Sequence, residues 1–205
     1  TTHVDVDPAT GLAEVFFERN TMLAAKTNYV EVVKDKKAPE YPYGLYKLGY
    51  TLYNLKEYEE SISAFKGVID IGRSGKSKIS FQRQSYSALA LSFTEVNDGW
   101  QRARDYFKKI GGEELEVSQL ETMASIFNKQ DKVKEELEVY EYLIANNRSS
   151  ARIPSYADRM IATYKAQEDL EMTEKQILRF YDYFDAKSSW SIANSKATDE
   201  KMKSA

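Results

Sequence analysis

The fold is decided by the stretch YGLYKLGYTLYNLKEYEESISAFKGVIDI, which occupies residues 43–71. Its first half carries a stripe with the i, i+3, i+4, i+7 spacing of one helix face: Leu45, Leu48, Gly49 and Leu52. A second helical stripe follows a short break: Tyr58, Ser61, Ile62, Phe65, Val68 and Ile69. Pro42 suits a first helical turn, and Gly72 suits a helix end. Residues 42–72 are therefore predicted to form two amphipathic helices joined by a short turn.

Matching stripes recur on both sides of this hairpin. The upstream copy consists of Leu12, Ala13, Phe16, Met22, Ala25, Tyr29 and Val32. Two downstream copies consist of Leu89, Ala90, Phe93, Trp100, Ala103, Phe107 and Ile110, and of Met123, Ala124, Phe127, Val133, Tyr140 and Leu143. In the second of these, Glu136 departs from the pattern because it stands where the other copies have a small residue. A weaker last copy contains Met160, Ile161, Tyr164, Ile177, Phe180 and Tyr183.

The recurrence predicts about five helix pairs, approximately over residues 8–38, 42–72, 81–111, 115–146 and 153–185. Gly72–Ser80, Gly111-Gly112 and Asn146–Ser150 are interpreted as junctions between pairs. Residues 1–7 are expected to be flexible, and residues 186–205 to form a polar tail or a capping segment that carries Trp190 and Ile192. The alternative is a helical bundle without repeats that contains one repeat-like hairpin.

Composition agrees with an all-α chain and narrows the chemistry. Among 205 residues there are 9 Gly and 4 Pro, fewer than a turn-rich all-β fold needs. With 0 Cys and 1 His, the chain has no disulfide, no thiolate nucleophile and no multi-histidine metal centre of its own. The net charge is −3 without a basic block, which argues against nucleic acid as the main partner. No apolar run reaches the length of a membrane-spanning helix.

The hairpin over residues 42–72 resembles a tetratricopeptide repeat. In that family a large apolar residue, a Leu-Gly pair and another large residue mark the first helix, and the second helix carries an aromatic, a small, an aromatic and an apolar residue. Those places are held here by Leu45, Leu48, Gly49, Leu52, Tyr58, Ser61, Phe65 and Val68. Leu45 and Leu52 stand where Trp and Tyr are commonest. The resemblance implies a right-handed superhelical solenoid whose first helices line a concave groove.

The informative feature of the composition is the 15 tyrosines. Four of them have i, i+3, i+7, i+10 spacing beside the leucine stripe: Tyr43, Tyr46, Tyr50 and Tyr53. The resemblance implies that these positions, with Asn54 beside them, face the groove. The corresponding positions in the next two copies are Gln84, Ser87, Leu91 and Thr94, and Ser118, Glu121, Ser125 and Asn128. The alternative is that some of the rings pack on the helix expected over residues 12–36.

Candidate catalytic features are weak in this sequence. Gly75-Lys76-Ser77 lacks the upstream glycine of a phosphate-binding loop, because Asp70 stands in that place. His3 has no second histidine, and adjacent carboxylates on a helix do not face each other. Asn147-Arg148-Ser149 matches a glycosylation acceptor, a triplet that is common by chance. We therefore predict no catalytic residue, no metal ligand and no cofactor.

The predicted function is a non-catalytic scaffold that captures a protein or peptide segment in a groove. Its predicted contacts are Tyr43, Tyr46, Tyr50, Tyr53, Asn54, Gln84 and Leu91. Replacing Tyr46 and Tyr50 by Ala is expected to weaken capture and to leave the melting transition nearly intact. The alternatives are a self-assembly module, including a homo-oligomer, that uses its own tail, and an accessory domain of a larger envelope protein or enzyme. Resemblance of residues 41–69 to repeats of bacterial envelope proteins implies a periplasmic location, with the cytoplasm as the alternative.

Overall fold

The computed structural model describes residues 8–75 and 81–195, and these ranges contain helices and turns but no strand. The predicted all-α class is thus confirmed. The helices are α1 (Pro8–Glu18), α2 (Met22–Val32), α3 (Tyr41–Asn54), α4 (Tyr58–Arg73), α5 (Gln82–Phe93), α6 (Gly99–Lys129), α7 (Val133–Asn146), α8 (Ile153–Ala166) and α9 (Leu170–Tyr183). The chain divides into two compact units, Thr1–Met123 and Ala124–Ala205, which are described separately.

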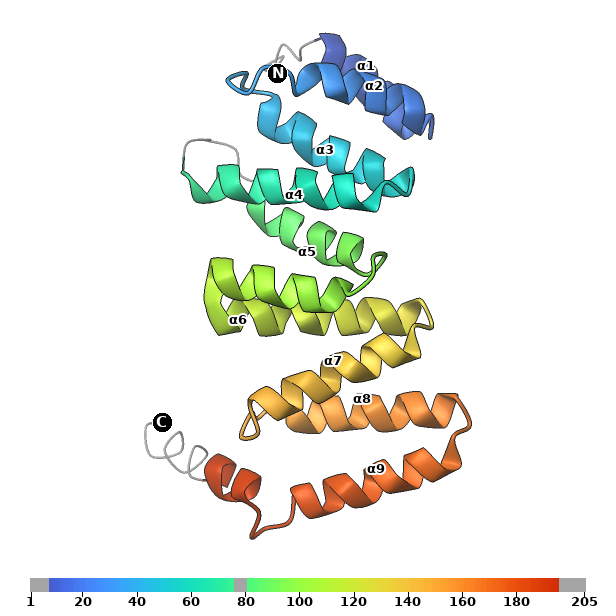
Figure 1. Cartoon of the computed structure of the whole chain (residues 1–205), viewed down its shortest axis with the longest axis vertical. Helices are drawn as coiled ribbons and strands as arrows, with labels where there is room; N and C mark the ends of the chain where they lie inside the picture. Colours follow the sequence, from blue (N-terminus) through green and yellow to red (C-terminus); the bar gives the residue numbers. More distant parts are fainter. Residues whose placement is uncertain (1–7, 76–80, 196–205) are drawn as a thin grey trace, which may run out of the picture. The chain divides into compact units, whose positions relative to one another are not determined.

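In the first unit, consecutive helices pack against each other in antiparallel fashion. Contacts join α1 to α2, α2 to α3, α3 to α4 and α4 to α5, as the succession of ribbons in Figure 1 shows. Within α6, Gly112 has φ 71° and ψ −166°, so the helix is interrupted at one residue. This interruption falls at the Gly111-Gly112 junction expected from the sequence, where a residue without Cβ adopts positive φ without strain.

Four of the helix hairpins share one turn geometry. A non-glycine residue with φ between 54° and 62° follows the first helix at Asn20, Lys56, Asp131 and Glu168. The next backbone N–H then bonds the carbonyl five residues back, from Thr21 to Phe16, Glu57 to Leu52, Lys132 to Phe127 and Asp169 to Tyr164, at 2.9–3.1 Å. This bond satisfies a carbonyl at the end of the helix. The same solution therefore closes hairpins whose turn sequences differ.

Small residues allow the close packing of α3 and α4. A Cβ added to Gly49 would lie 2.7 Å from the ring of Phe65, so no side chain fits there without displacement. Ser61 is fully buried, and its hydroxyl donates to the Gly49 carbonyl at 2.9 Å and contacts the Ser92 hydroxyl at 2.9 Å. Phe65, only 1% exposed, fills the space beside them. The positions that the sequence marks as small are thus the sites of helix contact.

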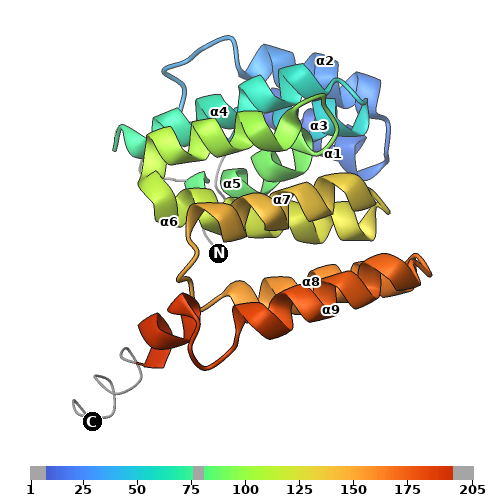
Figure 2. The same cartoon turned by 60° about the horizontal axis from the view of Figure 1, so that its bottom comes forward.

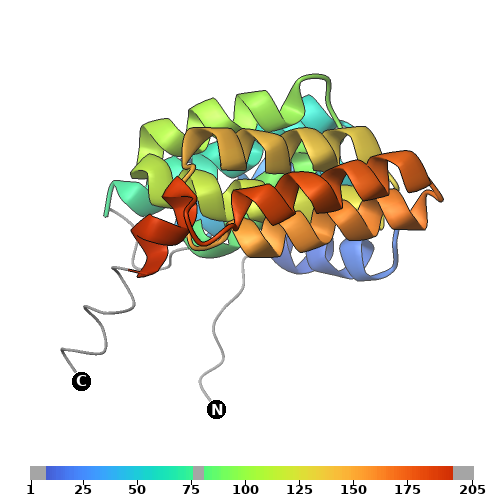
Figure 3. The same ribbon diagram turned by 90° about the horizontal axis from the view of Figure 1, so that it is seen from below.

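In the second unit, α7 contacts α8 and α8 contacts α9, and Figure 2 shows α8 and α9 lying side by side. The buried apolar side chains come from all three helices: Val139, Tyr140, Leu143, Ile144, Ile153, Tyr156, Ala157, Met160 and Phe180. Figure 3 shows a short helix beyond α9, over residues 189–195. There the Trp190 Nε1–H donates to the Ser150 carbonyl at 2.8 Å, and its ring lies edge-on to Phe184.

Three positions differ from the sequence pattern. Leu12 and Ile177 are each 49% exposed, and Gln176 is buried in place of Ile177. Leu12 lies on a face of α1 that stays half-exposed, so the prediction that it belongs to the core is wrong. In the weaker last copy, whose register the sequence leaves open by about one residue, the buried position is Gln176. Glu136, in contrast, is 1% exposed although it stands where the repeat pattern has a small residue.

Three predicted segments lie outside the described residues: the expected flexible segment 1–7, residues 76–80 of the expected loop, and residues 196–205 of the tail.

Candidate functional site

The tyrosine stripe of α3 lies half-buried in an aromatic cluster. The ring of Tyr46 stacks on Phe81 with centroids 5.0 Å apart and meets Tyr50 edge-on at 5.1 Å. Tyr50 in turn meets the buried Phe65 edge-on at 5.1 Å. Phe81 immediately precedes α5, so the cluster connects α3, α4 and the start of α5. Part of each tyrosine ring is therefore buried by packing within the cluster. The repeat pattern did not identify Phe81 as part of this cluster.

Tyr43 is bound to the preceding helix pair. Its hydroxyl donates to Glu14 at 2.9 Å, and the hydroxyl of Tyr29 donates to the same carboxylate. Lys47 forms an ion pair with Glu14 at 3.1 Å and lies 4.3 Å above the ring of Phe17. Burial, together with the hydrogen bond to Glu14, raises the pKa of Tyr43 to about 12. For this tyrosine the geometry follows the packing alternative rather than an open groove wall.

Tyr46 and Tyr50 combine fixed rings with an available hydrogen-bond donor. The Tyr46 hydroxyl donates to that of Tyr50 at 3.4 Å. Burial raises the pKa of Tyr50 above the ordinary value of 10.0, at which a phenol is already protonated at physiological pH. The two hydroxyls share this one hydrogen bond, so one of their two hydrogens has no acceptor within the described part of the chain. The pair therefore offers one hydroxyl hydrogen at the end of a ring that cannot easily turn away.

The other predicted contacts lie around this pair in different environments. Tyr53 packs against Tyr58 with centroids 5.5 Å apart, and burial and the nearby Glu95 raise its pKa. Asn54 is exposed, and its Nδ2 donates to the Tyr50 carbonyl at 3.0 Å. On α5, Gln84 is exposed and Leu91 is half-buried. All seven predicted residues thus lie in the first unit, on α3 and α5, which contact each other.

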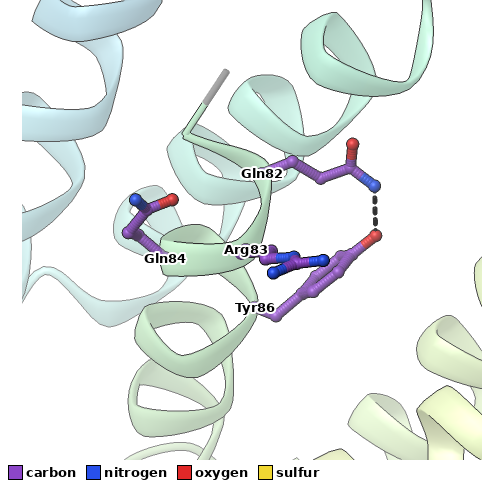
Figure 4. A pocket seen from close by; sticks show the side chains of 4 residues that line it. All are labelled: Gln82, Arg83, Gln84 and Tyr86. Carbon is purple, nitrogen blue, oxygen red and sulfur yellow. Dashed lines mark hydrogen bonds between the residues drawn. The ribbon is translucent and has the colours of Figure 1, made fainter.

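An open pocket of about 410 Å³ lies at the first turn of α5 and is lined by Gln82, Arg83, Gln84 and Tyr86. The Gln82 amide donates to the Tyr86 hydroxyl, and both side chains point to one side of the helix while Gln84 points to the other (Figure 4). Arg83 is exposed and forms no ion pair among the described residues. Arg83 adds a cation next to Gln84 that the sequence pattern did not mark.

The candidate site combines four kinds of chemical group. They are aromatic faces, neutral phenols, amides and one guanidinium. Among the residues described, no cluster of three or more His, Cys, Asp or Glu has the arrangement of a metal site. None of the helices described is both long enough and apolar enough to cross a bilayer.

Comparison with known proteins leaves the family open. No protein-family model matches the chain, and no curated protein matches it. Among solved structures, the chain is similar to BtubC (BKLC) from P. vanneervenii, with 14% sequence identity and a TM-score of 0.41. The match covers 87% of this chain and 79% of that chain.

Proposed function

We propose that this chain is a non-catalytic scaffold of tetratricopeptide-like helix pairs that binds a peptide segment of a partner protein across α3 and α5. The observation that carries the proposal is the Tyr46–Tyr50 pair. Its rings are held by Phe65 and Phe81, and it retains a hydroxyl hydrogen for an external acceptor. Exposed amides at Asn54 and Gln84 flank the pair on the same two helices.

The repeat interpretation is supported by recurrence at the backbone level. Four hairpins close with a residue in the left-handed conformation at the same place and with the same hydrogen bond, in both compact units. Chains built from such repeated helix pairs bury their apolar stripes between neighbouring pairs and present long surfaces to partners. A right-handed solenoid is the arrangement that follows from the resemblance. It stays part of the proposal.

Binding through fixed rings has an energetic advantage. A tyrosine that is already immobilised by its neighbours loses little side-chain entropy when a ligand binds, and such losses cost about 0.5–1.5 kcal/mol for each side chain that must be ordered. The hydroxyl of Tyr50 would donate to a peptide carbonyl, and the half-buried Leu91 would contact an apolar side chain. Gln84 and Asn54 would supply adaptable polar contacts nearby.

One of the alternatives bears on particular residues. In the self-assembly alternative the tail occupies a groove, but Trp190, its largest apolar group, is held by Phe184 and Ser150 of its own chain. The alternative of an accessory domain in a larger envelope protein or enzyme is compatible with the scaffold role. The periplasmic location implied by the resemblance remains a prediction, with the cytoplasm as its alternative.

The test is selection of binders from a random peptide library on the intact chain, followed by affinity measurement on variants. Tyr50→Phe keeps the ring and removes the hydroxyl, so it should weaken the selected peptides by about fivefold, the effect of one hydrogen bond. Gln84→Ala should weaken them as well, without loss of helical circular dichroism. Ser63→Ala, at an exposed position of α4, is the matched control. Selected peptides that bind Tyr50→Phe and Gln84→Ala as tightly as they bind Ser63→Ala and the unchanged chain would place the binding surface elsewhere.

A further inference from the structure

A second apolar face lies on α9, in the second unit. Four large side chains are strongly exposed there: Leu170 at 75%, Ile177 at 49%, Leu178 at 58% and Tyr181 at 76%. Their i, i+7, i+8, i+11 spacing gathers them on one face of the helix. The other face buries Gln176 and Phe180, and α9 packs on α8. The exposed face is thus distinct from the one that holds α9 in the fold.

The size of this face is that of an interface. With ~200 Å² for a large side chain, the exposed fractions amount to roughly 500 Å². The largest apolar patch of an ordinary monomer covers about 300–600 Å² and is often functional. If two such faces met, they would together bury ~1,000 Å², the lower bound for a specific protein–protein interface. The same face on a second copy of this chain therefore provides enough area for a specific interface.

We infer that α9 pairs with α9 of a second copy of this chain, antiparallel, about a twofold axis that passes between Ile177 and Leu178. Glu174 lies three residues before Ile177, and Tyr181 lies three residues after Leu178. An antiparallel pair exchanges these positions, so the phenol of one copy donates to the carboxylate of the other at both ends. A parallel pair would instead set the two Glu174 carboxylates against each other, which is repulsive.

The polar groups of the face are available for this exchange. Neither Glu174 nor Tyr181 forms a hydrogen bond or an ion pair within the described ranges, and both are exposed. An interface in which each copy supplies both the donor and the acceptor is self-complementary, as a twofold dimer requires. The inference is independent of the peptide-binding role, because that surface belongs to α3 and α5 of the other unit.

Sedimentation velocity of the whole 205-residue chain over a range of concentrations tests the pairing. We expect a monomer–dimer equilibrium that Leu178→Glu weakens by about tenfold or more, because a charge would replace apolar burial at the axis. Leu23→Glu, at a position 70% exposed on α2, is the matched control and should leave the equilibrium unchanged. A chain that stays monomeric at every concentration would overturn the inference. Equal weakening by both variants would also overturn it, because it indicates head-to-tail packing of α9 on α2.

Cysteine cross-linking distinguishes antiparallel from parallel pairing of the two α9 helices. Introduced cysteines have no competitors, because the chain has 0 Cys of its own. Positions 174 and 181 are separated by about 10 Å along one helix, beyond the ~7 Å Cα separation that a disulfide spans, so they cannot bridge within a chain. Glu174→Cys combined with Tyr181→Cys should give a covalent dimer on mild oxidation. Glu174→Cys alone should not. Efficient cross-linking by the single variant would establish parallel pairing and refute the antiparallel arrangement.

Discussion

Replacing Gly49 by alanine tests whether the contact between α3 and α4 requires a residue without Cβ. The new Cβ would lie 2.7, 2.8 and 3.0 Å from three atoms of the Phe65 ring. That ring cannot move aside freely, because it is 1% exposed and lies between Tyr46 and Tyr50. Overpacking of a core typically costs about 1–3 kcal/mol. Alanine also gains about 1 kcal/mol over glycine in a helix, so the expected net loss is about 0–2 kcal/mol in the free energy of unfolding.

Gly11→Ala in α1 is the matched control, because a Cβ at Gly11 meets no atom within 4 Å. It should gain up to about 1 kcal/mol from helix propensity alone. Urea denaturation followed by circular dichroism measures both variants under the same conditions. The reasoning fails if Gly49→Ala proves as stabilising as Gly11→Ala, because Phe65 would then yield without cost.

The remaining predictions concern a buried carboxyl and the aromatic pair. Glu136 accepts hydrogen bonds from Asn128 and Thr163, and burial raises its pKa above the ordinary 4.5. Because the folded state keeps this proton where the unfolded chain has lost it, stability should fall as pH rises from 4.5 through the raised pKa, with a slope of at most about 1.4 kcal/mol per pH unit. Glu136→Gln should flatten that fall, as denaturation at a series of pH values would show. An unchanged slope would mean that Glu136 ionises normally. Because the rings pack on Phe65 and Phe81, the expectation of a nearly intact melting transition no longer holds for Tyr46→Ala with Tyr50→Ala. This double variant should lower the free energy of unfolding by roughly 3 kcal/mol or more, whereas the double Phe variant should stay near the wild type. Equal stability of the two double variants in urea would mean that the rings are not part of the core.

The helices could be predicted because their signal is local. The stripes Leu45–Leu52 and Tyr58–Ile69 have the period of one helix face, and each covers enough turns to be distinguished from a chance spacing of apolar residues. The geometry of the hairpin turns was harder to predict from the sequence. Lys56 and Glu168 adopt positive φ although neither is the glycine that normally signals this conformation. The hydrogen bond to a carbonyl five residues back offsets the cost of positive φ at these residues. That bond cannot be inferred from the type of amino acid at the turn.

The candidate site was only half predictable for a similar reason. The spacing of Tyr43, Tyr46 and Tyr50 placed them on one side of α3, beside the leucine face. What covers that side depends on residues distant in sequence, such as Phe81 and Glu14. The same holds for Glu136, which the pattern marks as a flaw. Its place becomes tolerable only because partners from α6 and α8 donate to one carboxylate oxygen.

The ring contacts also change what a binding experiment must look like. With Tyr46 and Tyr50 packed on Phe65, alanine substitution removes core contacts and a binding surface together, so loss of capture by such a variant would not separate the two. Tyrosine itself allows the separation, since phenylalanine keeps the ring that packs on Phe65 and removes only the hydroxyl. If recognition uses the hydroxyl, phenylalanine at position 50 must lose affinity at unchanged stability. If recognition uses only ring edges, the same variant must bind normally while alanine fails in both assays.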